Sequence, residues 1–200
     1  SQYRSTTANG NTSIGSYSMT YASTSSDYNT AIGYNAMKGQ GSSALYTYSD
    51  YNTAIGYGAI MDINGGNYNT GIGSFSLYNT TTGLRNVGVG YATLYDNTTG
   101  ADNTAIGYYT LADNTSGNTN TAIGRQALRE NTTGTGNNGF GYRALYNNLT
   151  GNYNVAFGYQ AGYNTLGGNN VFIGYKAGYN EAGSNTLYID NSDTDDPLIH

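Results

Sequence analysis

Apolar and polar positions recur along this chain with a fixed period. Ten pairs of an apolar residue and Gly mark the repeat, and six successive steps between these glycines are 17 residues long. The glycines are Gly15, Gly33, Gly56, Gly73, Gly90, Gly107, Gly124, Gly141, Gly158 and Gly174. An Asn stands four residues before each of them, from Asn11 to Asn170. A short fixed period is typical of stacked repeats, in which each unit shares a core with its neighbours.

The unit reads roughly N-T-A-I-G-Y-x-A-L-x-x-N-T-T-G-x-x, and most copies carry a second Gly ten residues after the first. Two turn signals per unit predict two short strands, one on each side of a flattened coil. At about 3.3 Å per residue, 17 residues trace a perimeter of about 55 Å, and coils stack about 4.8 Å apart. The pattern therefore predicts an all-β fold, a parallel β-solenoid or β-roll of about eleven coils.

Two apolar rows are the predicted core. The first comprises Ile14, Ile32, Ile55, Ile72, Val89, Ile106, Ile123, Phe140, Phe157 and Ile173. The second comprises Met19, Met37, Ile60, Leu77, Leu94, Leu111, Leu128 and Leu145. Rows of Ala and other small residues flank both, which would let two sheets approach closely. The Asn row is expected to form hydrogen bonds along the stacking axis, as identical side chains do in other stacked sheets.

Two places break the period. The unit at residues 34–56 is six residues longer than the rest, and a bulged loop is expected around Gly39 to Tyr48. We assign residues 1–184 to the repeat domain. Residues 185–200 form a C-terminal cap or junction that opens with a degenerate eleventh copy, "NTLYID", and the ending suggests that the natural chain continues.

Composition narrows the class of protein. Charged residues make up 10% of the chain and the net charge is -5, so the sequence is polar without being highly charged. Only seven Lys and Arg are present, and they form no stripe in the sequence, which argues against nucleic-acid binding. There is no run of 18 apolar residues, so no membrane insertion by this segment is expected. Cys is absent, which excludes disulfides and thiolate metal sites.

The motif "NTAIGYxAL" resembles the head repeat of YadA-type trimeric autotransporter adhesins, from about Asn11 to Gly183. It is also similar to repeats of phage tail-fibre-like surface proteins. The resemblance implies a left-handed homotrimeric roll, with three chains side by side, displayed on a cell surface or a virion fibre for attachment. The unit here is longer and richer in Tyr than the family's. Independently of the family, a thin core would leave a broad Tyr and Ala face wet, which sister chains would cover.

The aromatic positions are the candidate contact surface. A Tyr follows the corner Gly in most units, and the bulged loop adds two more; the candidates are Tyr34, Tyr46, Tyr48, Tyr57, Tyr91, Tyr108, Tyr142, Tyr159 and Tyr175. Such a ladder could stack on the sugar rings of a host-surface glycan, contact a host protein, or lie in a subunit interface. The alternative is that Tyr simply suits a half-exposed strand.

Three further patterns have a functional and a structural interpretation. A row of Thr that includes Thr30, Thr53, Thr70, Thr104 and Thr121 could order water as an ice-binding solenoid does. Five turns begin N-x-T or N-x-S, at Asn79, Asn97, Asn114, Asn131 and Asn148, where N-glycan attachment competes with turn chemistry. Asp190, Asp193 and Asp195 offer oxygen ligands for Ca²⁺ or form a solvated acidic turn. No other cofactor is expected.

The chain has few residues suited to catalysis, because its one His is His200 and the acidic residues outside the C-terminal segment are scattered over turns. We therefore expect a protein that is not an enzyme. The leading hypothesis is an extracellular or cell-surface fibre segment, an adhesin head or tail-fibre-like shaft, that presents a multivalent attachment surface. The alternatives are a self-assembling structural filament and an ice-binding solenoid.

Overall fold

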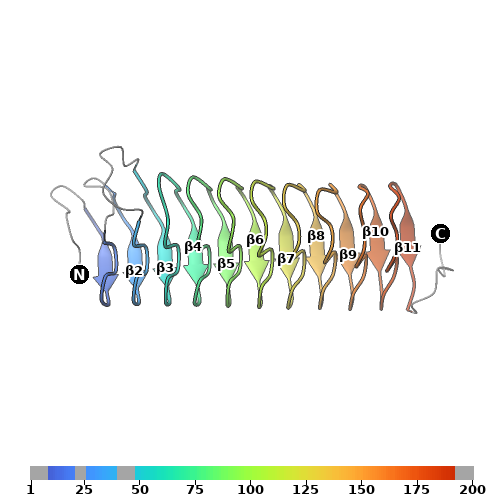
Figure 1. Ribbon diagram of the computed structural model, residues 1–200, viewed down its shortest axis with the longest axis horizontal. Helices are drawn as coiled ribbons and strands as arrows, with labels where there is room; N and C mark the ends of the chain where they lie inside the picture. The colour runs from blue at the N-terminus through green and yellow to red at the C-terminus, as the bar shows by residue number, and fades with distance from the viewer. Residues whose placement is uncertain (1–8, 21–25, 40–47, 192–200) are drawn as a thin grey trace.

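Each coil contributes one strand of three residues to a single parallel sheet. The computed structural model describes residues 9–20, 26–39 and 48–191. Its strands are β1 (Thr12–Ile14), β2 (Thr30–Ile32), β3 (Thr53–Ile55), β4 (Thr70–Ile72), β5 (Val87–Val89), β6 (Thr104–Ile106), β7 (Thr121–Ile123), β8 (Asn138–Phe140), β9 (Val155–Phe157), β10 (Val171–Ile173) and β11 (Leu187–Ile189). They pair in sequence order, and Figure 1 shows them stacked along the long axis of the molecule. The predicted all-β parallel solenoid is confirmed.

Equivalent residues of successive coils face each other across the sheet. Thr30 pairs with Thr53 and Ile32 with Ile55, although 23 residues separate them. The six additional residues of that unit therefore leave the register unchanged; the predicted bulge falls largely on residues 40–47, which lie outside the described residues. At the other end, β11 pairs in parallel with β10, which confirms the eleventh copy.

The prediction of a second strand in each coil is wrong. The residues after the corner Gly form turns in which alternate residues have positive φ, for example Phe75 at 59° and Leu77 at 56°. A strand needs negative φ at every residue, so this side cannot be a strand. It still joins the coils: the Phe75 amide donates to the Tyr57 carbonyl at 2.9 Å, and the Leu77 amide donates to the Thr93 carbonyl at 2.8 Å. In the described part of the chain, no helix has the length and apolar character needed to cross a membrane.

The core combines the predicted Leu row with the Ala row rather than the Ile row. Leu77, Leu94 and Leu111 are fully buried, as predicted. Opposite them lie the middle residues of the strands, such as Ala105 and Ala122, also fully buried. Because side chains alternate along a strand, the residues on either side of each Ala point outward. The predicted burial of the Ile row, and the predicted exposure of the Ala row, are both wrong.

The corner after each strand from β1 to β10 carries Gly, and the geometry there requires it. Gly124 has a φ of 129°, and a Cβ at this position would lie 2.6 Å from the carbonyl oxygen of Gly141 in the next coil. A side chain would therefore meet both backbone strain and a steric clash. The close stacking of these corners turns the chain sharply, and the residue that follows each Gly lies on the outside of the roll.

A ladder of buried Asn side chains runs along the interior, as predicted. The Oδ1 of Asn103 accepts bonds from the backbone N and the Nδ2 of Asn120, at 3.0 and 3.1 Å. The Nδ2 of Asn103 donates to the Gly117 carbonyl at 2.8 Å. Nine members of the row are buried: Asn29, Asn52, Asn69, Asn86, Asn103, Asn120, Asn137, Asn154 and Asn170. Each Asn thus ties together two coils and its own second turn.

Candidate functional site

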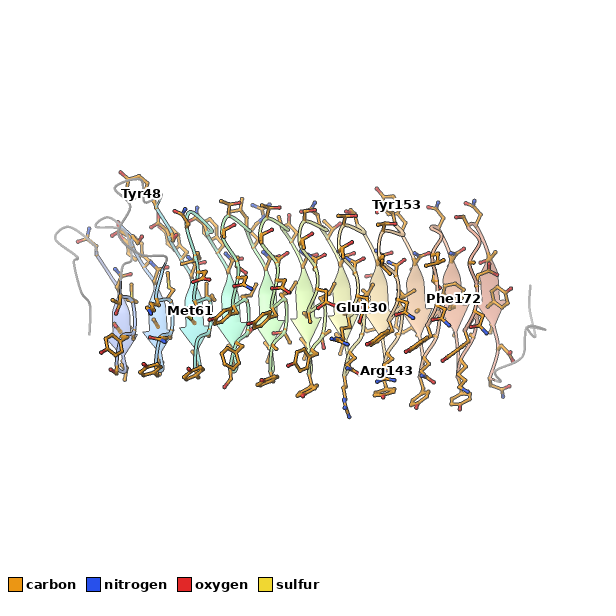
Figure 2. All side chains as sticks on the ribbon, in the orientation of Figure 1. Tyr48, Met61, Glu130, Arg143, Tyr153 and Phe172 are labelled. Atoms are coloured by element: carbon orange, nitrogen blue, oxygen red, sulfur yellow. The ribbon has the colours of Figure 1, made fainter. Side chains whose placement is uncertain are left out.

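The predicted Tyr ladder lies on the outer surface, at the edge where the strands end. Six of its members are between 40% and 48% exposed, and Tyr142 is half-buried: Tyr34, Tyr57, Tyr91, Tyr108, Tyr159 and Tyr175 are the six. Consecutive rings stack, with centroids 5.5 Å apart for Tyr34 and Tyr57 and 5.0 Å apart for Tyr142 and Tyr159. Figure 2 shows rings along the lower edge of the roll, where the side chain of Arg143 also projects.

A second Tyr row, which the sequence analysis missed, lies beside the first. Its members stand five residues after the corner Gly: Tyr78, Tyr95, Tyr146, Tyr163 and Tyr179. The rings stack at 5.0 Å between Tyr78 and Tyr95 and at 4.9 Å between Tyr163 and Tyr179. The repeat alignment contains the signal for this row, because Tyr recurs five residues after the corner Gly just as it recurs directly after it. The two rows together form an aromatic surface that continues from coil to coil along the roll.

Aromatic residues bridge the two rows in the middle coils and leave a pocket. Phe75 makes edge contacts with Tyr91 at 5.9 Å and with Tyr95 at 6.4 Å, and Tyr109 makes one with Tyr91 at 5.4 Å. Between Phe75 and Tyr109 the equivalent position holds the small residue Ala92. The resulting pocket has a volume of about 300 Å³ and is lined by Phe75, Tyr91, Ala92, Tyr95 and Tyr109.

Arginines interleave with the rings in the next two coils. The guanidinium carbon of Arg125 lies 5.4 Å from the centroid of the Tyr108 ring and 5.9 Å from that of Tyr142. That of Arg143 lies 5.1 Å from Tyr142 and 5.2 Å from Tyr146. Placing a cation over an aromatic face is favourable by about 0.5–1 kcal/mol at exposed sites. The Tyr surface is therefore also a positively charged one in this region.

The local environment raises the pKa of several tyrosines. Burial raises the pKa of Tyr78, and the Asp62 carboxylate adds to the effect. Burial also raises the pKa of Tyr95 and Tyr163, with neighbouring phenols contributing. These hydroxyls therefore stay neutral at physiological pH, and they offer hydrogen bonds rather than charge.

A third set of Tyr lies at the opposite edge, where the strands begin. Tyr28, Tyr51 and Tyr68 stack at 5.1 Å, and Figure 2 shows Tyr153, of the same row, at the upper edge. Tyr48 is 60% exposed, whereas Tyr46 lies outside the described residues. The structure thus brings the row of Tyr34 to Tyr175 together with the second row, and separates them from this edge.

The other sequence-based candidates fall in different places. Asn97, Asn114, Asn131 and Asn148 are fully buried in a second ladder, in which the Nδ2 of Asn114 donates to the Oδ1 of Asn97 at 2.7 Å, and Asn79 donates to Asp96. Burial of these amides favours the structural interpretation of the N-x-T turns. Asp190 is 4% exposed, while Asp193 and Asp195 lie outside the described residues, so the Ca²⁺ site stays a prediction. Within the described residues, no group of three His, Cys, Asp or Glu could hold a metal ion.

Comparisons of the chain with protein-family models, with curated proteins and with solved structures find no match.

Proposed function

We propose that this chain is a segment of an extracellular fibre, an adhesin head or tail-fibre-like shaft, whose Tyr surface attaches to glycans or proteins of a cell. The observation that carries the proposal is the stack of half-exposed Tyr rings on an elongated roll. Rings are rigid and lose little conformational entropy on binding. Repetition along the roll lets weak contacts act together, since a second contact in one molecule is effectively intramolecular.

The outward-facing strand residues support assembly of the fibre as a homotrimer. Ile106 and Ile123 are each 38% exposed, and Phe157 is 45% exposed, in one continuous apolar row along the sheet. An apolar row of this length on a wet surface favours burial against another chain. Three copies that pack through this face would leave the Tyr edges on the outside of the assembly.

Attachment is tested by removing rings at positions where the repeat itself tolerates a small residue. Ser74 occupies the first Tyr row, so Tyr91→Ser, Tyr108→Ser and Tyr159→Ser together keep a side chain that the fold already accepts. The control replaces Tyr51 and Tyr68, at the opposite edge, by Thr, which the same row carries at Thr119. Loss of adhesion to cells or glycan-coated beads in the first variant alone supports the proposal. Equal adhesion of both variants and of the wild type contradicts it.

A second candidate function, ice binding, rests on the same strand face. Thr104 and Thr121 point outward beside Ile106 and Ile123, in register across a sheet with strands about 4.8 Å apart. Regular rows of Thr and Ile could order water on a flat surface. The test is the growth of ice crystals in the presence of the protein: unaltered growth excludes this function, and a trimer that covers the face excludes it as well.

A further inference from the structure

The pocket lies at Ala92, where one row of side chains has a small residue between two aromatic ones. Ala92 stands two residues after its corner Gly. The same position holds Phe75 in the preceding coil and Tyr109 in the following coil, and all three residues have a positive φ, between 49° and 59°. Ala92 has only a methyl group where its two neighbours in the row carry rings, and the side chains around the pocket cover it almost completely. Its volume of about 300 Å³ lies at the lower end of the range for small-molecule sites, enough for a single sugar ring.

The wall of this pocket continues into the arginine cluster. Tyr109 lines the pocket, and the guanidinium carbon of Arg129 lies 5.7 Å from the centroid of its ring. Arg129 also lies 5.8 Å from the Tyr146 ring, and its Nη1 donates to the Tyr146 hydroxyl at 2.6 Å. The contacts of Arg143 and Arg125 then lead to Tyr108, whose ring packs on Tyr109 at 4.8 Å. Three arginines and four tyrosines thus form a closed ring of contacts, in which they alternate except where Tyr108 meets Tyr109.

The charge of this cluster is only partly neutralised. Arg85 forms an ion pair with Asp102, and Arg129 forms one with Glu130. The exposed guanidinium of Arg125 makes neither an ion pair nor a hydrogen bond, and the Nε of Arg143 donates to the neutral Gln126 side chain at 2.8 Å. Two guanidinium groups that flank the Tyr142 ring therefore keep their charge on a protein whose net charge is -5.

We propose that the Ala92 pocket and the adjacent arginine–tyrosine cluster bind an anionic polysaccharide, one whose sugar rings carry carboxylate or sulfate groups. The inference rests on the proposed attachment function and names the class of its ligand. The apolar C–H face of a sugar ring packs on the aromatic walls of the pocket. The acidic groups of neighbouring sugars accept hydrogen bonds from Arg125 and Arg143, whose planar donors match carboxylate and sulfate oxygens.

Charge and geometry favour a polysaccharide over a nucleic acid. Stacked rings and arginines also suit single-stranded nucleic acid, but such binding needs a long basic groove along the backbone. Here the basic groups are three arginines within two coils, Arg125, Arg129 and Arg143, which is too short a stretch to follow the backbone of a nucleic acid.

The test uses the full chain and immobilised polysaccharides: polygalacturonate for carboxylate, dextran sulfate for sulfate and unmodified dextran as the neutral probe, with a single-stranded oligonucleotide for comparison. Arg125→Ser with Arg143→Gln removes the two free charges by using residues that the same rows carry at Ser74 and Gln126. Arg85→Thr with Lys38→Gln removes two charges elsewhere and is the matched control. Ala92→Tyr fills the pocket with the residue found at Tyr109.

The proposal expects the wild type to bind an acidic polysaccharide in preference to dextran, and the preferred probe identifies which acid is recognised. Arg125→Ser with Arg143→Gln should weaken that binding at least about tenfold, Ala92→Tyr by a similar factor, and the control by less than about twofold. Binding should also weaken at high salt, because salt screens exposed charges.

Four results would overturn it. Equal binding to dextran, or an unchanged affinity in the arginine variant, would refute the anionic class while leaving attachment intact. Tighter binding of the oligonucleotide than of any polysaccharide would mean that the ligand is a nucleic acid. If the wild type binds no polysaccharide yet still adheres to cells through its Tyr rows, the inference fails alone; if it adheres to nothing, the proposed function fails with it.

Discussion

The ring of Phe172 occupies the space into which a side chain at Gly162 would project. Phe172 stands where earlier strands carry Ala, and Gly162 stands where earlier coils carry Leu128 and Leu145. Gly178, in the following coil, lies against the other side of the same ring. The interior has room for one large side chain per coil, and here it comes from the strand instead of from the turn (Figure 2).

This exchange can be reversed by mutation. Phe172→Ala alone should lower the free energy of unfolding by about 3–5 kcal/mol, because it leaves a cavity that nothing fills. Adding Gly162→Leu and Gly178→Leu restores the pattern of the earlier coils and should recover most of the loss. Gly162→Leu alone should overpack the core and cost about 1–3 kcal/mol. Denaturant unfolding measures all three; a triple variant no more stable than Phe172→Ala would contradict the exchange.

The Asn ladder should contribute more to stability than any surface ion pair. Asn120→Ala removes the Oδ1 that accepts the hydrogen bond of the Asn137 backbone N–H, and a buried unsatisfied group costs about 1–3 kcal/mol. Arg85→Ala breaks the exposed ion pair with Asp102 and should cost less than about 1 kcal/mol. The two midpoints of chemical unfolding test this ranking, and a larger loss from Arg85→Ala would reverse it.

The outward Ile row predicts burial against sister chains, and the resemblance to trimeric adhesin heads gives the expected number of three. The wild type should have three times the chain mass of 21.1 kDa by light scattering after size exclusion. Ile106→Lys with Ile123→Lys places two charges in the proposed interface and should give the mass of one chain with an unchanged far-ultraviolet circular dichroism spectrum. Thr104→Ser, in a neighbouring row, is the mild control. A wild type of single-chain mass would rule out the trimer.

Stability should decline at alkaline pH. The pKa of Tyr78, Tyr95 and Tyr163 is raised in the folded protein, chiefly by burial. A raised folded pKa means that the unfolded chain loses these protons first, so stability is retained below about pH 10 and falls as pH rises above it. Phenolate absorbance during a pH titration, followed beside circular dichroism, measures both events. Phenols that all titrate at the ordinary value in the folded protein would contradict the cause.

The sequence predicted the stack, its register and the Asn ladder, because these depend on residues that recur at fixed steps. It misassigned Ile106 and Ala105, because hydrophobicity alone ranks Ile above Ala for burial. What decides between them is the width of the interior: with Leu94 and Leu111 inside, only a small residue fits on the strand side. The prediction of a second strand in each coil was wrong because a positive φ at residues such as Leu77 is rare and has no simple sequence signal.

The candidate surface was predicted in part for a similar reason. The row that includes Tyr108 and Tyr142 could be predicted because each of its residues directly follows the corner Gly that recurs in ten units of the sequence. The pocket at Ala92 and the contacts of Arg125 with two rings depend on which residues of different coils lie side by side. Neighbouring positions in adjacent coils are about one full unit apart in the sequence, so only the register of the stack reveals them.

Every strand from β2 to β10 pairs only with the strands immediately before and after it. A whole coil can therefore be duplicated or deleted without creating any new kind of contact, while an insertion of another size must leave the register unchanged, as the six additional residues in 34–56 do. The length of the roll and the number of Tyr rings on it would then change together, in whole coils, through unequal recombination of the gene. The length of the protein is then set by the number of coils that the gene encodes, while the contacts within each coil stay the same.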